Sequence, residues 1–127
     1  MESAKIETPA FYSLRLKPGE DLFSSLRAFL EREGLSRAFV LSTIGSLRKV
    51  VVNYPETNDM PPKVGKVTLE GLFEINGISG EVWWEGPSIR IHVHGSITER
   101  GKTVYGGGLT EPAEVLKLAE LFIAGVK

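Results

Sequence analysis

The 127-residue chain has 42% hydrophobic and 24% charged residues and a formal net charge of −1. This composition predicts one soluble globular domain spanning residues 1–127, without a membrane span. The nearly neutral charge excludes a protein that holds DNA through its overall charge, since duplex binding depends on Lys and Arg that neutralise phosphates. Cysteine and glutamine are absent, which excludes disulfides, thiolate catalysis and cysteine-ligated zinc, favours a reducing cytoplasm, and is typical of proteins from thermophiles.

The first part of the chain predicts a strand followed by a helix. Residues 11–16 alternate between apolar and polar positions, as a half-buried strand does. Acidic Glu20 and Asp21 then precede apolar residues that recur on one helical face, and Gly34 is a typical helix end. We therefore expect one principal helix over about residues 20–33.

Two dipeptides predict tight turns between strands. Gly45-Ser46 interrupts two apolar runs, and Asn76-Gly77 is the pair most typical of a hairpin. The strands that these turns would join are residues 37–44, 47–54, 66–75 and 78–85. Between the two pairs of strands, residues 55–64 contain three prolines and predict a long exposed loop that forms the rim of a site.

Trp83 and Trp84 end the last of these strands. Because neighbouring side chains on a strand point to opposite faces, one of the two indoles faces away from the core. Either that indole meets a partner subunit, as exposed aromatic surface often does, or both are covered within the chain.

Both histidines lie in a hairpin predicted for residues 89–109. The alternation of the strand places Arg90, His92, His94 and Ser96 on one face, opposite an apolar core face. Two imidazoles on one face indicate either a metal site or a polar face that is solvated or lies at a subunit cleft.

Residues 113–124 are ambiguous. They contain strong helix formers, yet their apolar residues leave no polar face, which is equally typical of a buried strand.

A series of blocks, in order, resembles the plants-and-prokaryotes conserved (PPC) domain, also described as PD1-like. The blocks are RLKPGEDLFSSL at 15–26, STIGSL at 42–47, GLFEINGISGEV at 71–82, HVHGSI at 92–97 and GGGL at 106–109. The resemblance implies an α/β (α+β) fold of mostly antiparallel strands with one principal helix, and assembly as a homotrimer. It also implies a strand over most of the C-terminal segment.

The family in turn resembles acetolactate decarboxylase in an HxH strand followed by a third histidine, three imidazoles that can hold a catalytic zinc. His92 and His94 match the first two, and Gly108 stands where the third belongs. Glu74 is a candidate oxygen ligand in its place. Alternatively, Gly106, Gly107 and Gly108 let another strand or subunit approach closely, at an interface that Trp83 and Trp84 share.

The expected function is that of a homotrimeric, non-enzymatic binding or regulatory protein without a cofactor, associated with DNA through the resemblance. The chain has no Arg-Gly-Arg-Pro core of an AT-hook, and Leu72 replaces the arginine of the GRFEIL block of plant members. Two alternatives remain: a zinc-dependent, decarboxylase-like enzyme acting on a small molecule at His92 and His94, and a ligand-binding protein that uses the same strand.

Overall fold

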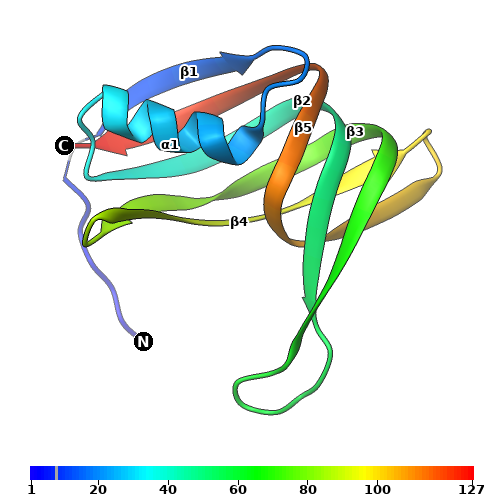
Figure 1. Ribbon diagram of the computed structural model, residues 1–127. Helices are drawn as coiled ribbons and strands as arrows, with labels where there is room; N and C mark the ends of the chain where they lie inside the picture. Colours follow the sequence, from blue (N-terminus) through cyan, green and yellow to red (C-terminus); the bar gives the residue numbers. More distant parts are fainter. Residues whose placement is uncertain (8) are drawn as a thin grey trace.

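The computed structural model describes residues 1–7 and 9–127, and within them the chain forms one helix and five strands (Figure 1). The elements are β1 (Ala10–Leu16), α1 (Leu22–Arg32), β2 (Arg37–Pro55), β3 (Val64–Glu85), β4 (Ser88–Glu99) and β5 (Thr103–Val126). Every pairing between these strands is antiparallel. The predicted α+β fold of antiparallel strands with one principal helix is confirmed.

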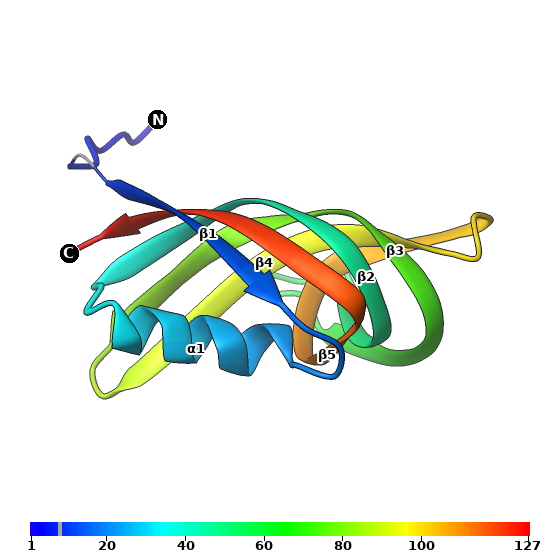
Figure 2. The same ribbon diagram turned by 90° about the horizontal axis from the view of Figure 1, so that it is seen from above.

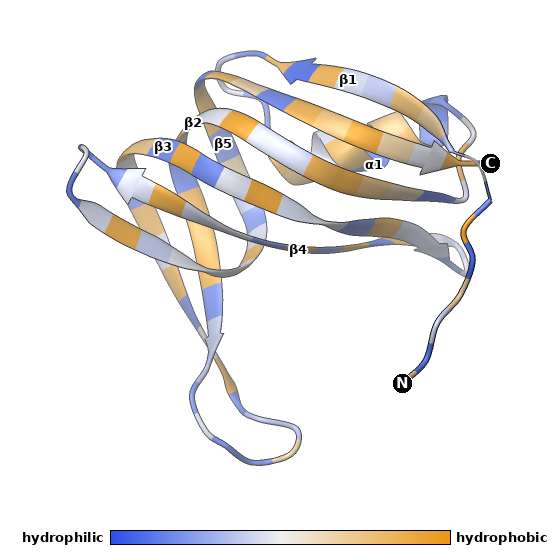
Figure 3. Cartoon of the chain, turned by 180° about the vertical axis from the view of Figure 1, so that it is seen from behind, coloured by the Kyte–Doolittle hydropathy of each residue, from blue (hydrophilic) through white to orange (hydrophobic). Residues whose placement is uncertain are grey.

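The strands form one sheet in the order β1-β5-β2-β3-β4. The first part of β5 also pairs with β4, so the sheet closes on itself. Helix α1 lies in the concave side of this curved sheet (Figures 1 and 2), and its buried side chains join those of the strands in one core. Hydrophobic and hydrophilic bands alternate along the strands, as the two-residue period of a half-buried sheet requires (Figure 3).

The turn predicted at Gly45-Ser46 is wrong, because β2 runs without interruption from Arg37 to Pro55. Gly45 pairs with Ile75 of β3 on one side and with Ala119 of β5 on the other. Its φ is +134°, and a Cβ built there would overlap the backbone of β5. The glycine therefore serves the close approach of two strands, and pairing along both edges of β2 outweighs the local preference for a turn.

The hairpin predicted at Asn76-Gly77 is also wrong, because β3 continues through it to Glu85. The register with β4 shifts between Ile75 and Gly77, so Asn76 is the extra residue of a β-bulge. Its side-chain amide donates to Thr98 Oγ1 at 2.9 Å and to Ser96 Oγ at 3.2 Å. The dipeptide that favours a turn in isolation here bends a long strand.

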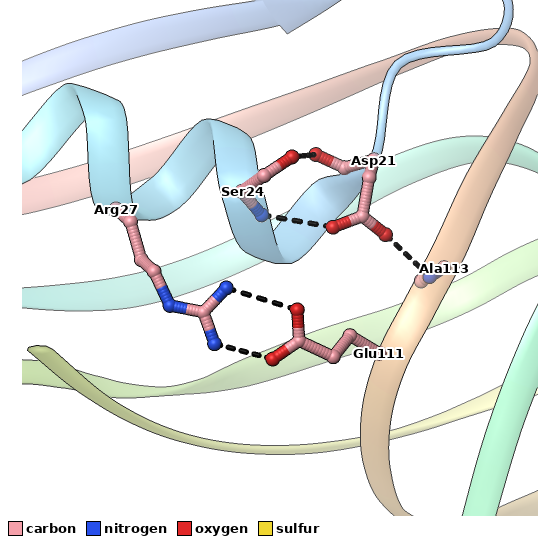
Figure 4. Close-up of polar contacts among 5 residues, drawn as sticks. All are labelled: Asp21, Ser24, Arg27, Glu111 and Ala113. Atoms are coloured by element: carbon pink, nitrogen blue, oxygen red, sulfur yellow. Dashed lines mark hydrogen bonds and ion pairs between the residues drawn. The ribbon is translucent and has the colours of Figure 1, made fainter.

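The helix begins where the sequence predicts it (Figure 4). Asp21 is the N-cap, and one of its carboxylate oxygens accepts a hydrogen bond from Ser24 N at 2.8 Å. The other oxygen accepts one from the backbone N of Ala113 in β5 at 2.6 Å. At the other end Gly34 adopts a φ of +64°, as the residue after a helix often does.

The C-terminal segment is a strand, as the resemblance implies and against its helix propensity. β5 pairs with β1 from Ala119 to Gly125 and with β2 from Gly108 to Val126. Pro112 lies where the register with β2 is shifted, a place where a missing N–H disturbs no ladder. Partners on both edges decide the conformation.

The loop predicted after Pro55 is present, and it projects with the ends of β2 and β3 away from the helix-covered part of the sheet (Figure 1). We call residues 50–69 the arm. Within the described part of the chain, no helix has the length and apolar character that crossing a membrane requires.

Candidate functional site

The two histidines share one face of β4, as predicted. His92 and His94 are exposed, whereas Val93 and Ile97 between and beyond them are buried. The Nε2 atoms of the two imidazoles are 3.1 Å apart, and the rings meet edge to face. At this distance the two nitrogens either share one proton in an N–H···N hydrogen bond or turn both lone pairs to one metal ion.

Gly80 brings β3 close to the backbone that carries the histidines. It pairs with Val93, and its φ is +155°. A Cβ built on it would overlap the carbonyl oxygen of His92 and lie 2.7 Å from Val93 Cα. Only glycine fits this contact, so Gly80 helps to fix the position of His92. No local sequence pattern marks this role of Gly80.

Gly108 lies between the side chains of His94 and Asn53. It pairs with His94 of β4 on one side and with Asn53 of β2 on the other. Directly opposed residues in an antiparallel sheet share a face, so the three positions face the same way. A Cβ built on Gly108 would overlap the amide oxygen of Asn53 and lie 3.0 Å from its Cγ. The Asn53 amide therefore covers Gly108, which is buried.

Sequence reasoning missed Asn53 because no local motif contains it. Its relation to Gly108 depends on the register between β2 and β5, which the printed order of residues does not reveal.

A cavity of about 460 Å³ opens beside His94 at the base of the arm. Its lining residues are Asn53, Tyr54, Pro55, Pro62, Val64, His94, Gly106, Gly107 and Gly108. The walls are mainly apolar, and the His94 and Asn53 side chains supply polar groups. Pro62 places the predicted proline-rich loop at the rim of this cavity. Cβ atoms built on the glycines of the triplet would meet the neighbouring strands or the Asn53 amide, so these glycines serve close strand packing beside the cavity.

Glu74 lies elsewhere. It pairs with Thr98, which is four residues further along β4 than His94, a distance of about 13 Å at ~3.3 Å per residue. It lines a separate cavity of about 270 Å³ together with Arg100. Across residues 1–7 and 9–127, no three His, Cys, Asp or Glu side chains are grouped so that they could hold a metal ion.

The tryptophans lie near the far end of β3. Trp83 is half-buried and pairs with Arg37 and Arg90, while Trp84 keeps 38% of its surface exposed. Neither indole lines the cavity beside His94. The structure thus brings together the histidines and the glycine triplet, and it leaves the tryptophans and Glu74 apart from them.

Most arginines form ion pairs with carboxylates. Within the described residues, six of the seven form an ion pair, and Arg100 is the exception. The bidentate pair of Arg27 with Glu111 joins α1 to β5 (Figure 4). It raises the pKa of Arg27 and lowers the pKa of Glu111, mainly through the hydrogen bonds between them.

Comparison with known proteins identifies relatives over nearly the whole chain. The Plants and Prokaryotes Conserved (PCC) domain matches residues 3–127. A metal-containing protein of Archaeoglobus fulgidus is 30% identical, with a TM-score of 0.85 over 100% of this chain and 86% of that one. A plant- and prokaryote-conserved (PPC) protein of Pyrococcus horikoshii is 25% identical, with a TM-score of 0.85 over 100% of this chain and 85% of that one.

The bifunctional protein GlmU of Synechococcus sp. (strain JA-3-3Ab) is 28% identical over 113 residues. The match covers 89% of this chain and 17% of GlmU, so this chain corresponds to a small part of that relative. Two more distant structures share the fold alone. They are a protein of Ralstonia eutropha provisionally named DNA-binding (19% identity, TM-score 0.77, 96% of this chain and 81% of that one) and the α-acetolactate decarboxylase of Bacillus subtilis (14%, 0.58, 91% and 52%).

Proposed function

Since this chain belongs to the Plants and Prokaryotes Conserved (PCC) domain family, we propose that it is a homotrimeric, non-enzymatic binding protein whose ligand lies in the cavity beside His94. One observation carries the proposal: the cavity lies against Gly108, the position at which this chain has a glycine in place of the third histidine of the family's pattern. The amide of Asn53 covers Gly108, and Asn53 is one of the residues that line this cavity.

A non-enzymatic role follows from the side chains available. A catalytic zinc normally keeps three protein ligands and an open position, and only His92 and His94 are matched here. Glu74 lies about 13 Å further along the sheet, at ~3.3 Å per residue. Two imidazoles without a third strong ligand favour binding over catalysis.

The shape of the cavity indicates the kind of ligand. Its volume of about 460 Å³ suits a small molecule. Tyr54, Pro55, Pro62 and Val64 offer apolar contact, while the amide of Asn53 offers both a donor and an acceptor. A compact molecule with one apolar part and one polar group fits this lining.

The trimer is supported by an exposed apolar face on β1, β2 and β5. Phe11, Leu41, Ile44 and Phe122 keep 75%, 54%, 55% and 43% of their surfaces exposed. Phe122 pairs with Ser42 of β2 and with Ser13 of β1, so it lies at the centre of this face. Large apolar side chains gathered on one face are typical of a subunit contact.

The proposal is tested by ligand binding to a blocked cavity. Val64→Trp places an indole at the cavity wall, and Val67→Trp, on the same exposed strand of the arm but outside the lining, is the matched control. We expect a small metabolite that raises the melting temperature of the wild type and of Val67→Trp, and has no effect on Val64→Trp. Equal stabilisation of all three proteins, or of none, would contradict the proposal.

A zinc-dependent, decarboxylase-like enzyme is the second candidate, favoured by the 3.1 Å separation of the two imidazole nitrogens. The 30% identical relative from Archaeoglobus fulgidus is a metal-containing protein. Zinc would supply a Lewis acid for a carbonyl oxygen, with His92 and His94 holding it. Release of carbon dioxide from a 2-hydroxy-3-keto acid, abolished in His92→Ala, would establish this candidate in place of a binding protein.

DNA association is a further part of the expected function, supported by the naming of relatives. Six of the seven arginines are paired with carboxylates, so the positive charge that a chain offers to phosphates comes mainly from its lysines. The trimer would have to bring lysines of several subunits to one strip. Binding to a labelled duplex should then fall steeply between 50 mM and 200 mM salt, as phosphate contacts dictate, and lack of binding at the lower salt would remove this part.

A further inference from the structure

We infer that a second cavity, between β3 and the turn that joins β4 to β5, binds a small α-amino acid with an apolar side chain. Arg100 holds the carboxylate of this ligand, and Glu74 holds its ammonium group. The second cavity and the cavity beside His94 have no lining residue in common. The amino-acid site is therefore separate from the function proposed above and goes beyond it.

Arg100 is a cation without a carboxylate partner. The other six of the seven arginines form ion pairs within the part of the chain that the structure describes. Arg100 is exposed and lines the second cavity. A guanidinium binds a carboxylate through two parallel hydrogen bonds. Its charge is thus available for the carboxylate of a ligand in this cavity.

The turn that carries Arg100 is not the one in which an arginine is favoured. The backbone N of Lys102 donates to Glu99 O at 2.9 Å and closes the turn. The two central residues, Arg100 and Gly101, have φ of +48° and +71°. Asn and Gly are preferred at such angles, and a bulky side chain is disfavoured. Backbone preference does not explain an arginine here, whereas a contact with a ligand does.

Glu74 supplies the opposite charge from β3. It is exposed and lines the same cavity. Among the described residues, no ion pair joins it to a basic side chain, Arg100 included. The backbone N of Arg100 donates to Leu72 O at 3.2 Å, which ties the turn to β3 two residues from Glu74. Two opposite charges that line one cavity without pairing match the two charges of a zwitterion.

The rest of the lining fits a short apolar side chain. Leu72, Phe73 and Leu116 complete it together with Gly101. Phe73 is buried, while Leu72 keeps 46% of its surface exposed. The volume of about 270 Å³ lies just below the range of about 300–1,000 Å³ that is typical of drug-sized ligands. A molecule of the size of leucine therefore suits this cavity better than a nucleotide or a peptide.

The test is calorimetric titration of the full chain with L-leucine and two analogues. Isocaproate lacks the ammonium group of leucine, and isoamylamine lacks its carboxylate. We expect leucine to bind and each analogue to bind at least about tenfold more weakly, since each lacks one charge-assisted contact. No binding of leucine at millimolar concentrations, or equal affinity for leucine and either analogue, would overturn the inference.

Two variants assign the charges. Arg100→Asn suits the turn, so it should melt no lower than the wild type and still bind leucine at least about tenfold more weakly. Glu74→Gln should weaken leucine binding as well. It should also strengthen the binding of isocaproate, because the carboxylate that repels this anion is gone. Wild-type affinity for leucine in either variant would overturn the inference.

Two controls locate the site. Lys102→Asn makes the same change of charge in the same turn but outside the cavity lining, and it should bind leucine as the wild type does. Val64→Trp blocks the cavity beside His94 and should also leave leucine binding unchanged. Loss of leucine binding in Val64→Trp would place leucine beside His94 and overturn the inference, while it would leave the function proposed above intact.

Discussion

Replacing Gly80 with alanine should lower the free energy of unfolding and displace the strand that carries the histidines. The added Cβ would meet the carbonyl oxygen of His92 and Val93 Cα, which are backbone atoms that cannot rotate away. We estimate about 1–3 kcal/mol for overpacking and another ~1–2 kcal/mol for a non-glycine residue at a φ of +155°. The free energy of unfolding should therefore fall by about 2–5 kcal/mol.

The matched control is Gly77→Ala in the same strand. A Cβ built on Gly77 meets no atom within 4 Å, so this change should alter the free energy of unfolding by no more than about 0.5 kcal/mol. Urea denaturation followed by tryptophan fluorescence measures both variants. A loss below about 1 kcal/mol for Gly80→Ala, or equal losses for both, would refute the close strand contact on which the position of His92 depends.

Three further predictions concern the helix, its ion pair and the trimer. Asp21→Ala should lower the free energy of unfolding by about 2–4 kcal/mol in urea denaturation, since it removes a helix cap and leaves a buried backbone N–H without an acceptor; the loop variant Asp59→Ala should not, and equal effects would count against the cap. The pKa of Glu111 is lowered from its usual value of 4.5 by Arg27, so the stability from this pair is present above that pH and is lost as the pH falls through the lowered pKa. Because both side chains are partly exposed, Glu111→Gln should lose less than about 1 kcal/mol at pH 7, and a gap from the wild type that persists in strong acid would contradict this origin. Leu41→Lys should convert the proposed trimer to monomers in sedimentation velocity, and a Leu41→Lys protein that is still trimeric would show that the contact lies elsewhere.

The helix, the loop and the histidine face were predictable because each is encoded locally. The apolar period and the acidic start mark α1, the prolines mark the loop, and the alternation around Val93 places His92 and His94 on one face. In these segments the local preference and the tertiary contacts agree.

The two predicted turns failed for the opposite reason. Gly45-Ser46 and Asn76-Gly77 favour turns when they stand alone, but both lie in strands that are paired along two edges. The sequence carries no local sign that these glycines accommodate a neighbouring backbone or a bulge. Residues 113–124 show the same effect, since helix formers become a strand between two partners.

The candidate site was half predictable. The HxH pattern and the glycine at position 108 can be read from one short stretch. Asn53 cannot, because its contact with Gly108 exists only once β2 and β5 are paired in register. Contacts between strands that are far apart in sequence depend on the register of the folded sheet, and no short stretch of sequence encodes them.

The most direct measurement is a crystal structure of the protein with a small metabolite that raises its melting temperature. The account predicts that the metabolite lies in the cavity beside His94, against Gly108 and the Asn53 amide, in each subunit of the proposed trimer. A metabolite bound elsewhere, with this cavity empty, would contradict it.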